Sequence, residues 1–206
     1  ASWARQTYAY NISEQQNTTD TFTDLLSNWN IMDNNTGDNI LSVRYKENVS
    51  FIDSLKLSIN KSTTKPYSSG YIVSKNKYGY GYYECTMKYA GADGINNACW
   101  LTSDNYNYTF PNGTIIERND EIDINEGKYN KKISIALHRW YPKTGRVWGH
   151  DGTYSYTESR NTDFTTNYNT FGFYYSPSIL QWYVNGILVK SLSNSEAKYN
   201  IPEGSS

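Results

Sequence analysis

The stretch that decides the fold is Asn119 to Gly127, which reads N-D-E-I-D-I-N-E-G. Isoleucines alternate with polar residues in it, which predicts a β-strand with one buried face. Side chains two residues apart share a face of a strand, so Glu121 and Asp123 point the same way. In a regular strand Glu126 points to the opposite face. The three acids therefore share one surface only if the strand is interrupted between Asp123 and Glu126.

A β-bulge around Ile124 or Asn125 is the expected interruption. It adds one unpaired residue and returns Glu126 to the face of the other two acids. Without it, Glu126 would point into the core, where an unpaired carboxylate is strongly unfavourable. The alternative interpretation is that the acids decorate a solvated strand beside Arg118 and Lys128.

The rest of the chain predicts a nearly all-β protein. Apolar residues recur with period two between segments rich in Gly, Asn, Ser and Pro, and no stretch keeps a helical apolar stripe. This many strands in one domain implies two packed sheets. Strands are predicted at residues 41–48, 54–59, 71–74, 79–89, 97–102, 121–126, 133–140, 169–175, 180–184 and 187–192.

Two hairpins are predicted from turn residues. The Asn185-Gly186 pair lies between two apolar runs and indicates a type I′ turn. A second hairpin is expected to join residues 79–89 and 97–102 through a turn at Ala92. It would place Cys85 opposite Cys99, either as a strained disulfide or as two small buried side chains.

Composition limits the function. The chain has 206 residues, a formal net charge of -1 and a pI near 6.2, and it lacks a basic stripe for nucleic acid. No apolar run approaches the roughly 20 residues that cross a bilayer, so we expect no membrane insertion. We expect a single monomeric domain over residues 1–206. Its 21 Tyr and 6 Trp, against 6 Phe, are rings of the kind that suit sugar-binding clefts.

Three segments resemble glycoside hydrolase family 16. Residues 121–126 match the family's bulged E-x-D-x-x-E form. Residues 74–84 (S-K-N-K-Y-G-Y-G-Y-Y-E) are similar to its S-x-N-x-Y-G-Y-G-x-x-E segment, and residues 180–186 (L-Q-W-Y-V-N-G) to its I-x-W-Y-V-D-G hairpin. The resemblance extends over roughly residues 29–201. It implies a concanavalin-like antiparallel β-sandwich, or jelly roll, with a concave substrate cleft.

The resemblance also implies a reaction. The protein would be a secreted, retaining endo-β-glycosidase acting on β-1,3 or β-1,4 linkages of a polysaccharide. Glu121 would be the nucleophile, Glu126 the general acid and then base, and Asp123 the residue that positions Glu121. No metal or cofactor is required, although the family leaves room for a structural Ca²⁺.

Other functions share this sandwich. A transglycosylase would use the same intermediate with a sugar hydroxyl in place of water. A lectin-like carbohydrate-binding module would need no paired acids. The bulged motif points to the laminarinase, agarase and porphyranase branch, so the polymer is either a β-glucan or a β-galactan.

Several side chains are candidate substrate contacts. Trp100 would share the cleft face with Glu84 in the predicted hairpin, and His138 and Trp140 would continue that face on the next strand. Trp182 matches the Trp of the family's hairpin. For Trp100 and Trp182 core packing is an equally good interpretation.

The two ends of the chain depart from the family pattern. The family normally adds strands after the Asn185-Gly186 hairpin, whereas here the sequence stops at Ser206. Residues 3–10 alternate and resemble the missing last strand, so we expect residues 1–10 to supply an extra edge strand.

Overall fold

The computed structural model describes residues 20–22, 24–36, 40–142 and 148–193. These residues fall into two compact units, one before Tyr78 and one from Tyr78 onward. Each unit has its own sheets, and the acidic strand belongs to the second. The predicted edge strand at residues 1–10 lies outside the described residues. The single domain over residues 1–206 stays a prediction.

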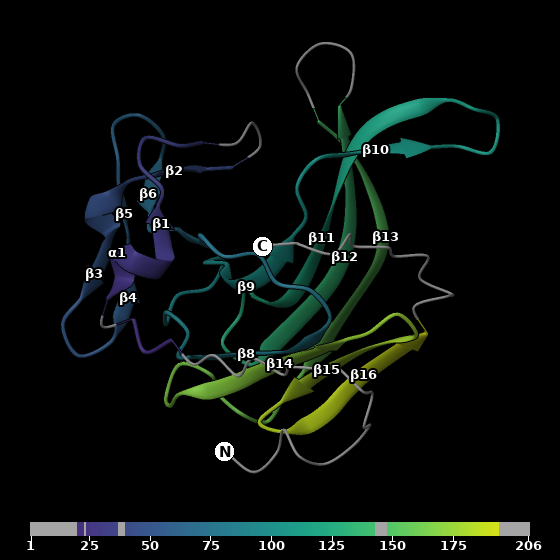
Figure 1. The fold of residues 1–206 in the computed structure, drawn as a ribbon. Coiled ribbons are helices and arrows are strands. Elements are labelled where there is room, and N and C mark those ends of the chain that lie inside the picture. The colour runs from purple at the N-terminus through teal and green to yellow at the C-terminus, as the bar shows by residue number, and fades with distance from the viewer. Residues whose placement is uncertain (1–19, 23, 37–39, 143–147, 194–206) are drawn as a thin grey trace. The chain divides into compact units, whose positions relative to one another are not determined.

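The second unit contains two antiparallel sheets, which we call the front and back sheets. The front sheet has the order β10 (Tyr106–Thr109), β11 (Ile115–Gly127), β12 (Lys132–Pro142), β13 (Trp148–Ser159), with β9 (Asn97–Thr102) also paired to β11. The back sheet has the order β16 (Ile187–Ser193), β15 (Ile179–Val184), β14 (Asn169–Tyr175), β8 (Gly81–Met87). The long strands β11, β12 and β13 curve past the back sheet (Figure 1).

The core lies between the two sheets because each contributes one apolar face. Ile122 and Ile124 of β11 and the alternating aliphatic residues of β12 are buried, and on β14 and β15 the alternating buried residues are mostly aromatic or aliphatic. The inward-facing set includes Ile122, Ile124, Ile133, Ile135 and Leu137 of the front sheet, and Phe171, Phe173, Leu180, Trp182 and Val184 of the back sheet. The polar residues between them face outward, as period-two alternation requires.

The first unit is built from short strands. α1 (Leu25–Asn28) precedes β1 (Trp29–Ile31), which pairs with β7 (Ile72–Ser74). A small sheet joins β2 (Ser42–Arg44), β6 (Tyr67–Ser69) and β5 (Ile59–Lys61), and after the 3-10 helix η2 (Lys46–Asn48) the strands β3 (Val49–Phe51) and β4 (Leu55–Leu57) form a hairpin. In the described part of the chain, no helix is long and apolar enough to cross a membrane.

The all-β fold and the Asn185-Gly186 hairpin are confirmed. Asn185 and Gly186 have φ angles of 50° and 76°, the positive values that a type I′ turn needs, and Val184 pairs with Ile187 across it. β9 and β14 have the predicted bounds. β10 and β13 were not predicted.

The predicted hairpin between residues 79–89 and 97–102 is wrong. β8 pairs with β14 in the back sheet, whereas β9 pairs with β11 in the front sheet. Cys85 and Cys99 are still neighbours, because a hydrogen bond joins their side chains from opposite sheets, and both are free thiols. Alternation reveals which face a residue occupies but not which strand lies beside it.

Candidate active site

A β-bulge at Ile124 places the three acids on one face of β11. Along β9, Asp123 pairs with Trp100 and Asn125 pairs with Cys99, so the register shifts by one residue at Ile124. Glu126 then pairs with Ala98, which shares a face with Trp100. The expected bulge is confirmed, and it returns Glu126 to the face of Glu121 and Asp123.

Buried hydrogen bonds hold the bulge from behind. The fully buried Asn125 accepts a hydrogen bond from the Tyr89 hydroxyl (2.7 Å) and donates one to the Asn97 carbonyl (3.0 Å). From the back sheet, the Trp182 indole donates to the Asp123 carbonyl (3.0 Å). These bonds satisfy polar groups that would otherwise be costly in the core, so they fix the irregular backbone.

Each acid has a polar partner on the outer face of the front sheet. The Trp140 indole donates to Glu121 Oε2 (3.0 Å), and His138 Nε2 lies 2.9 Å from Asp123 Oδ2. Asn96, just before β9, donates its side-chain amide to Glu126 Oε1 (2.7 Å). The three carboxyl groups are therefore positioned by side chains from both neighbouring strands.

The electrostatics of the cluster favour a shared proton. Burial and the negative charge of Asp123 raise the pKa of Glu121 to about 7, against the lowering effects of His138 and of the Trp140 hydrogen bond. Burial also raises the pKa of Asp123. Burial acts to lower the pKa of His138, but its hydrogen bond to Asp123 and the charges of the acids raise it overall. An imidazolium beside the carboxylates offsets part of their repulsion.

Donor atoms of Glu121, Asp123 and His138 all lie within 4.8 Å of one another. Two carboxylates and an imidazole form a donor set that transition metals accept. The same atoms are occupied by the hydrogen bonds described above, so the geometry is equally that of a metal-free acid cluster.

Comparison with known proteins agrees with this geometry. Residues 34–205 match the model of the family described as glycosyl hydrolases family 16. The chain belongs to glycosyl hydrolases family 16. This membership classes it with the glycoside hydrolases.

Curated relatives of this family 16 chain include beta-glucanases. One from Paenibacillus polymyxa is 34% identical over 145 residues, which is 68% of this chain and 53% of the relative. Another from Paenibacillus macerans is 30% identical over 167 residues, 79% of this chain and 63% of the relative. The chain thus spans less than two thirds of the length of these relatives.

Solved structures share the fold at low sequence identity. A β-porphyranase from Bacteroides plebeius has a TM-score of 0.70 at 16% identity, with 90% of this chain and 76% of that chain covered. The laminarinase catalytic domain from Thermotoga maritima has a TM-score of 0.64 at 22% identity, covering 83% and 72%. These likenesses support the jelly-roll architecture of the family 16 chain.

Three of the five predicted substrate contacts lie on the face of the acids. Trp100 pairs directly with Asp123, and His138 pairs with Glu121 across β11 and β12. Trp140, two residues after His138, lies on the same face and contacts Glu121. These residues line the surface around the three carboxyl groups, and their contact with substrate stays a prediction.

The other two predicted contacts are wrong. Trp182 is only 1% exposed, because its ring packs in the core against Phe173. It therefore supports β11 from behind and cannot stack on a sugar. Glu84 lies on the outer face of the back sheet, since its neighbour Cys85 points inward toward Cys99. The wrong hairpin caused this second error.

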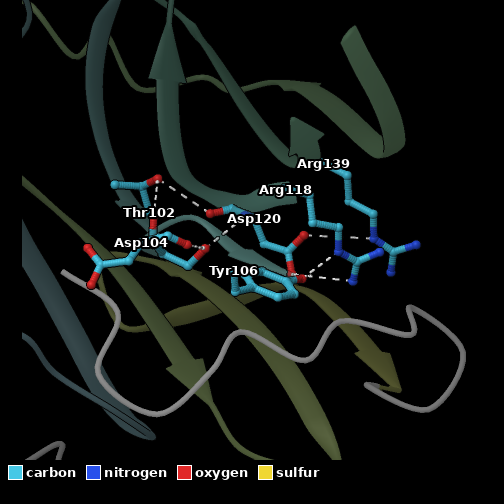
Figure 2. Close-up of polar contacts among 7 residues, drawn as sticks. Thr102, Asp104, Tyr106, Arg118, Asp120 and Arg139 are labelled. Atoms are coloured by element: carbon cyan, nitrogen blue, oxygen red, sulfur yellow. Dashed lines mark hydrogen bonds and ion pairs between the residues drawn. The ribbon is translucent and has the colours of Figure 1, made fainter. Parts of the chain in front are cut away.

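A buried ionic network, which the sequence analysis missed, anchors β11 just before Glu121. Asp120 is fully buried on the opposite face, and Figure 2 shows Tyr106, Arg118 and Arg139 directed toward it. The Tyr106 hydroxyl donates to Asp120 Oδ2 (2.7 Å), and Arg118 Nε donates to the Tyr106 oxygen (2.6 Å). Nitrogens of Arg118 and Arg139 each lie 3.9 Å from an Asp120 oxygen.

Within this network the effects of burial and of charge on Asp120 oppose each other. Burial raises the pKa of Asp120, while Tyr106 and the two arginines act to lower it. The Ser103 N–H, just after β9, donates to the Asp120 carbonyl (2.9 Å), and the Asp120 N–H donates to the Ser103 hydroxyl (2.9 Å). The spacing of charged residues in the sequence did not reveal this network, because its members come from strands whose pairing was not predicted.

Proposed function

We propose that this chain is a retaining endo-β-glycanase. The observation that carries the proposal is the bulge at Ile124, which gathers Glu121, Asp123 and Glu126 on one face. Hydrolysis with retention needs two carboxyl groups on opposite sides of the scissile bond, one as nucleophile and one as acid. Glu121 and Glu126, at the two ends of the bulged segment, fit those roles.

In the first step the Glu121 carboxylate attacks the anomeric carbon and forms a glycosyl ester. The bond to the departing sugar oxygen breaks, and that oxygen takes the proton of the Glu126 carboxyl group. Asn96, hydrogen-bonded to Glu126, orients this acid. In the second step Glu126, now a carboxylate, removes a proton from water, and the resulting oxygen nucleophile displaces Glu121 from the anomeric carbon.

Asp123, His138 and Trp140 support the nucleophile in this proposal. The Trp140 hydrogen bond stabilises the ionised form of Glu121, and the positive charge of His138 acts in the same direction. Asp123 holds His138 in place through their 2.9 Å contact. These residues act by electrostatics and positioning, so no metal or cofactor is required; a structural Ca²⁺ elsewhere is compatible with the mechanism.

The favoured substrate class is a neutral β-glucan with β-1,3 or β-1,4 linkages. The curated relatives named beta-glucanases support this choice, because they share more sequence with this chain than the porphyranase and carrageenase structures do. A polysaccharide is too large to be taken up intact by most cells, so we propose that the enzyme is secreted. We also propose that it works as a monomer.

The test is release of reducing ends from laminarin, mixed-linkage glucan, agarose, porphyran and κ-carrageenan. We expect oligosaccharides from a β-glucan, with the anomeric configuration of the product retained by NMR. Glu121→Gln should lower kcat by about a thousandfold or more, because the covalent intermediate cannot form. Glu117→Gln, an exposed acid on the same strand, is the control and should retain activity.

Two results would redirect the proposal. Products longer than the substrate would indicate transglycosylation through the same intermediate. Binding to a polymer without cleavage by the unmutated chain would instead indicate a lectin-like module.

A further inference from the structure

The outer face of the back sheet carries a second set of side chains suited to carbohydrate. Inward-facing Tyr83, Phe173 and Trp182 leave their strand neighbours on the solvent side, as alternation requires. We call the resulting surface the back-sheet patch; it consists of Tyr82, Glu84, Gln181 and Tyr183. The front-sheet acids lie beyond the core from it, so the cleft does not include this surface.

Tyr82 forms the centre of the back-sheet patch. It is 44% exposed, and its hydroxyl donates to Glu84 Oε2 (3.0 Å). The ring extends over Gly172 on the adjacent strand β14, where a Cβ would collide with the Tyr82 hydroxyl. The glycine therefore makes room for the tyrosine to lie against the sheet. A ring held in this way presents its other face to solvent, which is the geometry that stacks on a sugar ring.

Tyr183 repeats the arrangement on β15. Its hydroxyl donates to Gln181 Oε1 (2.9 Å), a residue two positions away on the same face. The rings of Tyr183 and Tyr82 meet edge to face, with centroids 6.0 Å apart and an angle of 67° between their planes. Each ring is thus fixed by one polar side chain of its own strand.

The polar members can also meet sugar hydroxyls. A carboxylate accepts several hydrogen bonds, and an amide both donates and accepts them, so one bond to a tyrosine uses part of their capacity. Glu84 is the one charged residue of the four. Its negative charge favours a neutral, hydroxyl-rich ligand and opposes a sulfated one.

We propose that the back-sheet patch binds a neutral polysaccharide chain at a site separate from the catalytic cleft. The choice of a neutral glucan as ligand rests on the proposed function, but the surface itself does not. Two sites on opposite sheets would let one protein hold a long polymer while cleaving another segment of it. Binding at the patch would raise the effective concentration of the polymer at the catalytic site, and only a chain long enough to reach both sites would show this gain.

The experiment uses affinity electrophoresis in gels that contain mixed-linkage glucan, laminarin or κ-carrageenan. All variants carry Glu121→Gln so that the polymer stays intact. We expect retardation in a neutral glucan, and Tyr82→Ala or Tyr183→Ala should weaken the apparent affinity about fivefold or more. Tyr129→Ala is the control, because Tyr129 is 50% exposed and lies outside the patch.

Glu84→Ala is a second variant that guards against misfolding, since it truncates an exposed side chain. It should also weaken retardation. With Glu121 restored, the patch variants should hydrolyse short oligosaccharides as the unmutated chain does and hydrolyse the polymer more slowly.

The outcomes separate the two proposals. Equal retardation of the patch variants and Tyr129→Ala, or no retardation of the parent in any gel, overturns the back-sheet site. If the chain hydrolyses no polymer but loses retardation with Tyr82→Ala, the patch stands and the proposed function falls.

Discussion

At the scale of single residues, β12 controls the charge of the acids on β11. Trp140 and His138 each lower the pKa of Glu121, whereas burial and Asp123 raise it. The result is a pKa of about 7, so Glu121 is partly protonated and partly ionised near neutral pH. A nucleophile in the proposed role must be ionised. In the proposed mechanism, the indole and the imidazole therefore keep more of Glu121 ionised at neutral pH.

Trp140→Phe tests this control. Removing the hydrogen bond to Glu121 raises the pKa of that carboxyl group further, so a larger fraction is protonated at a given pH. The acidic limb of the kcat/KM profile should move upward from about pH 7. kcat should fall about tenfold or more, because hydrogen bonds to charged groups contribute roughly 1.5–3 kcal/mol.

The matched control for that profile is Trp29→Phe. Trp29 also donates its indole hydrogen to a carboxylate, at 2.7 Å from Asp20, but lies in the other unit. An unchanged acidic limb in Trp140→Phe, or an equal shift in both variants, would contradict the assigned role.

At the scale of elements, the bulge depends on side chains that hold irregular backbone. Asn125→Ala removes both of the hydrogen bonds of this buried amide and leaves the Tyr89 hydroxyl and the Asn97 carbonyl without them. The free energy of unfolding should fall by about 1–3 kcal/mol. Activity should fall as well, since the loosened backbone no longer fixes Glu126 relative to Glu121.

Urea unfolding and turnover of the same preparation measure both effects. Asn107→Ala, an exposed asparagine on β10, should change neither by much. A variant that is destabilised but fully active would show that the bulge keeps its geometry without Asn125.

The same strands show how far sequence reasoning reaches. Carboxyl spacing suggested the bulge, because a regular strand would point Glu126 into the core, and the resemblance of the neighbouring segments favoured it over a solvated acidic strand. Asn-Gly chemistry predicted the β15–β16 turn. Alternation could not identify the partner of β8, which lies far along the chain in β14. That error displaced Glu84 from its true face. The roles of Asn96 and Asp120, and the hydrogen bonds by which Asn125 holds the bulge, could not be predicted because they depend on contacts between strands.

At the scale of the whole molecule, the site opposes the stability of the sandwich. Burial of ionised Glu121 is unfavourable, so its pKa rises from 4.5 to about 7. A raised carboxyl pKa means that the folded state binds the proton more tightly than the unfolded state. The associated stabilisation is complete below pH 4.5 and is lost as the pH rises toward 7.

Glu121→Gln should therefore be more stable than the unmutated protein at neutral pH. The difference in Tm should be small near pH 4.5, should grow as the pH rises toward 7 and should level off above it, because the variant carries no charge to bury. Differential scanning calorimetry over that range measures it. Glu117→Gln should give a difference that is smaller and flat with pH. A Tm difference for Glu121→Gln that shrinks with rising pH would contradict the electrostatic account.

The bulge at Ile124 also has an evolutionary consequence. Loss of the single codon for Ile124 would leave one residue between Glu121 and Asp123 and one between Asp123 and Glu126, so a regular strand would hold all three acids on one face. A bulged and an unbulged acidic strand are therefore one in-frame deletion apart, and a lineage could exchange them without passing through a form that lacks the acid pair. Deletion of Ile124 tests this under the proposed function: the deletant should fold and still cleave polymer, whereas a folded deletant without turnover would disprove it.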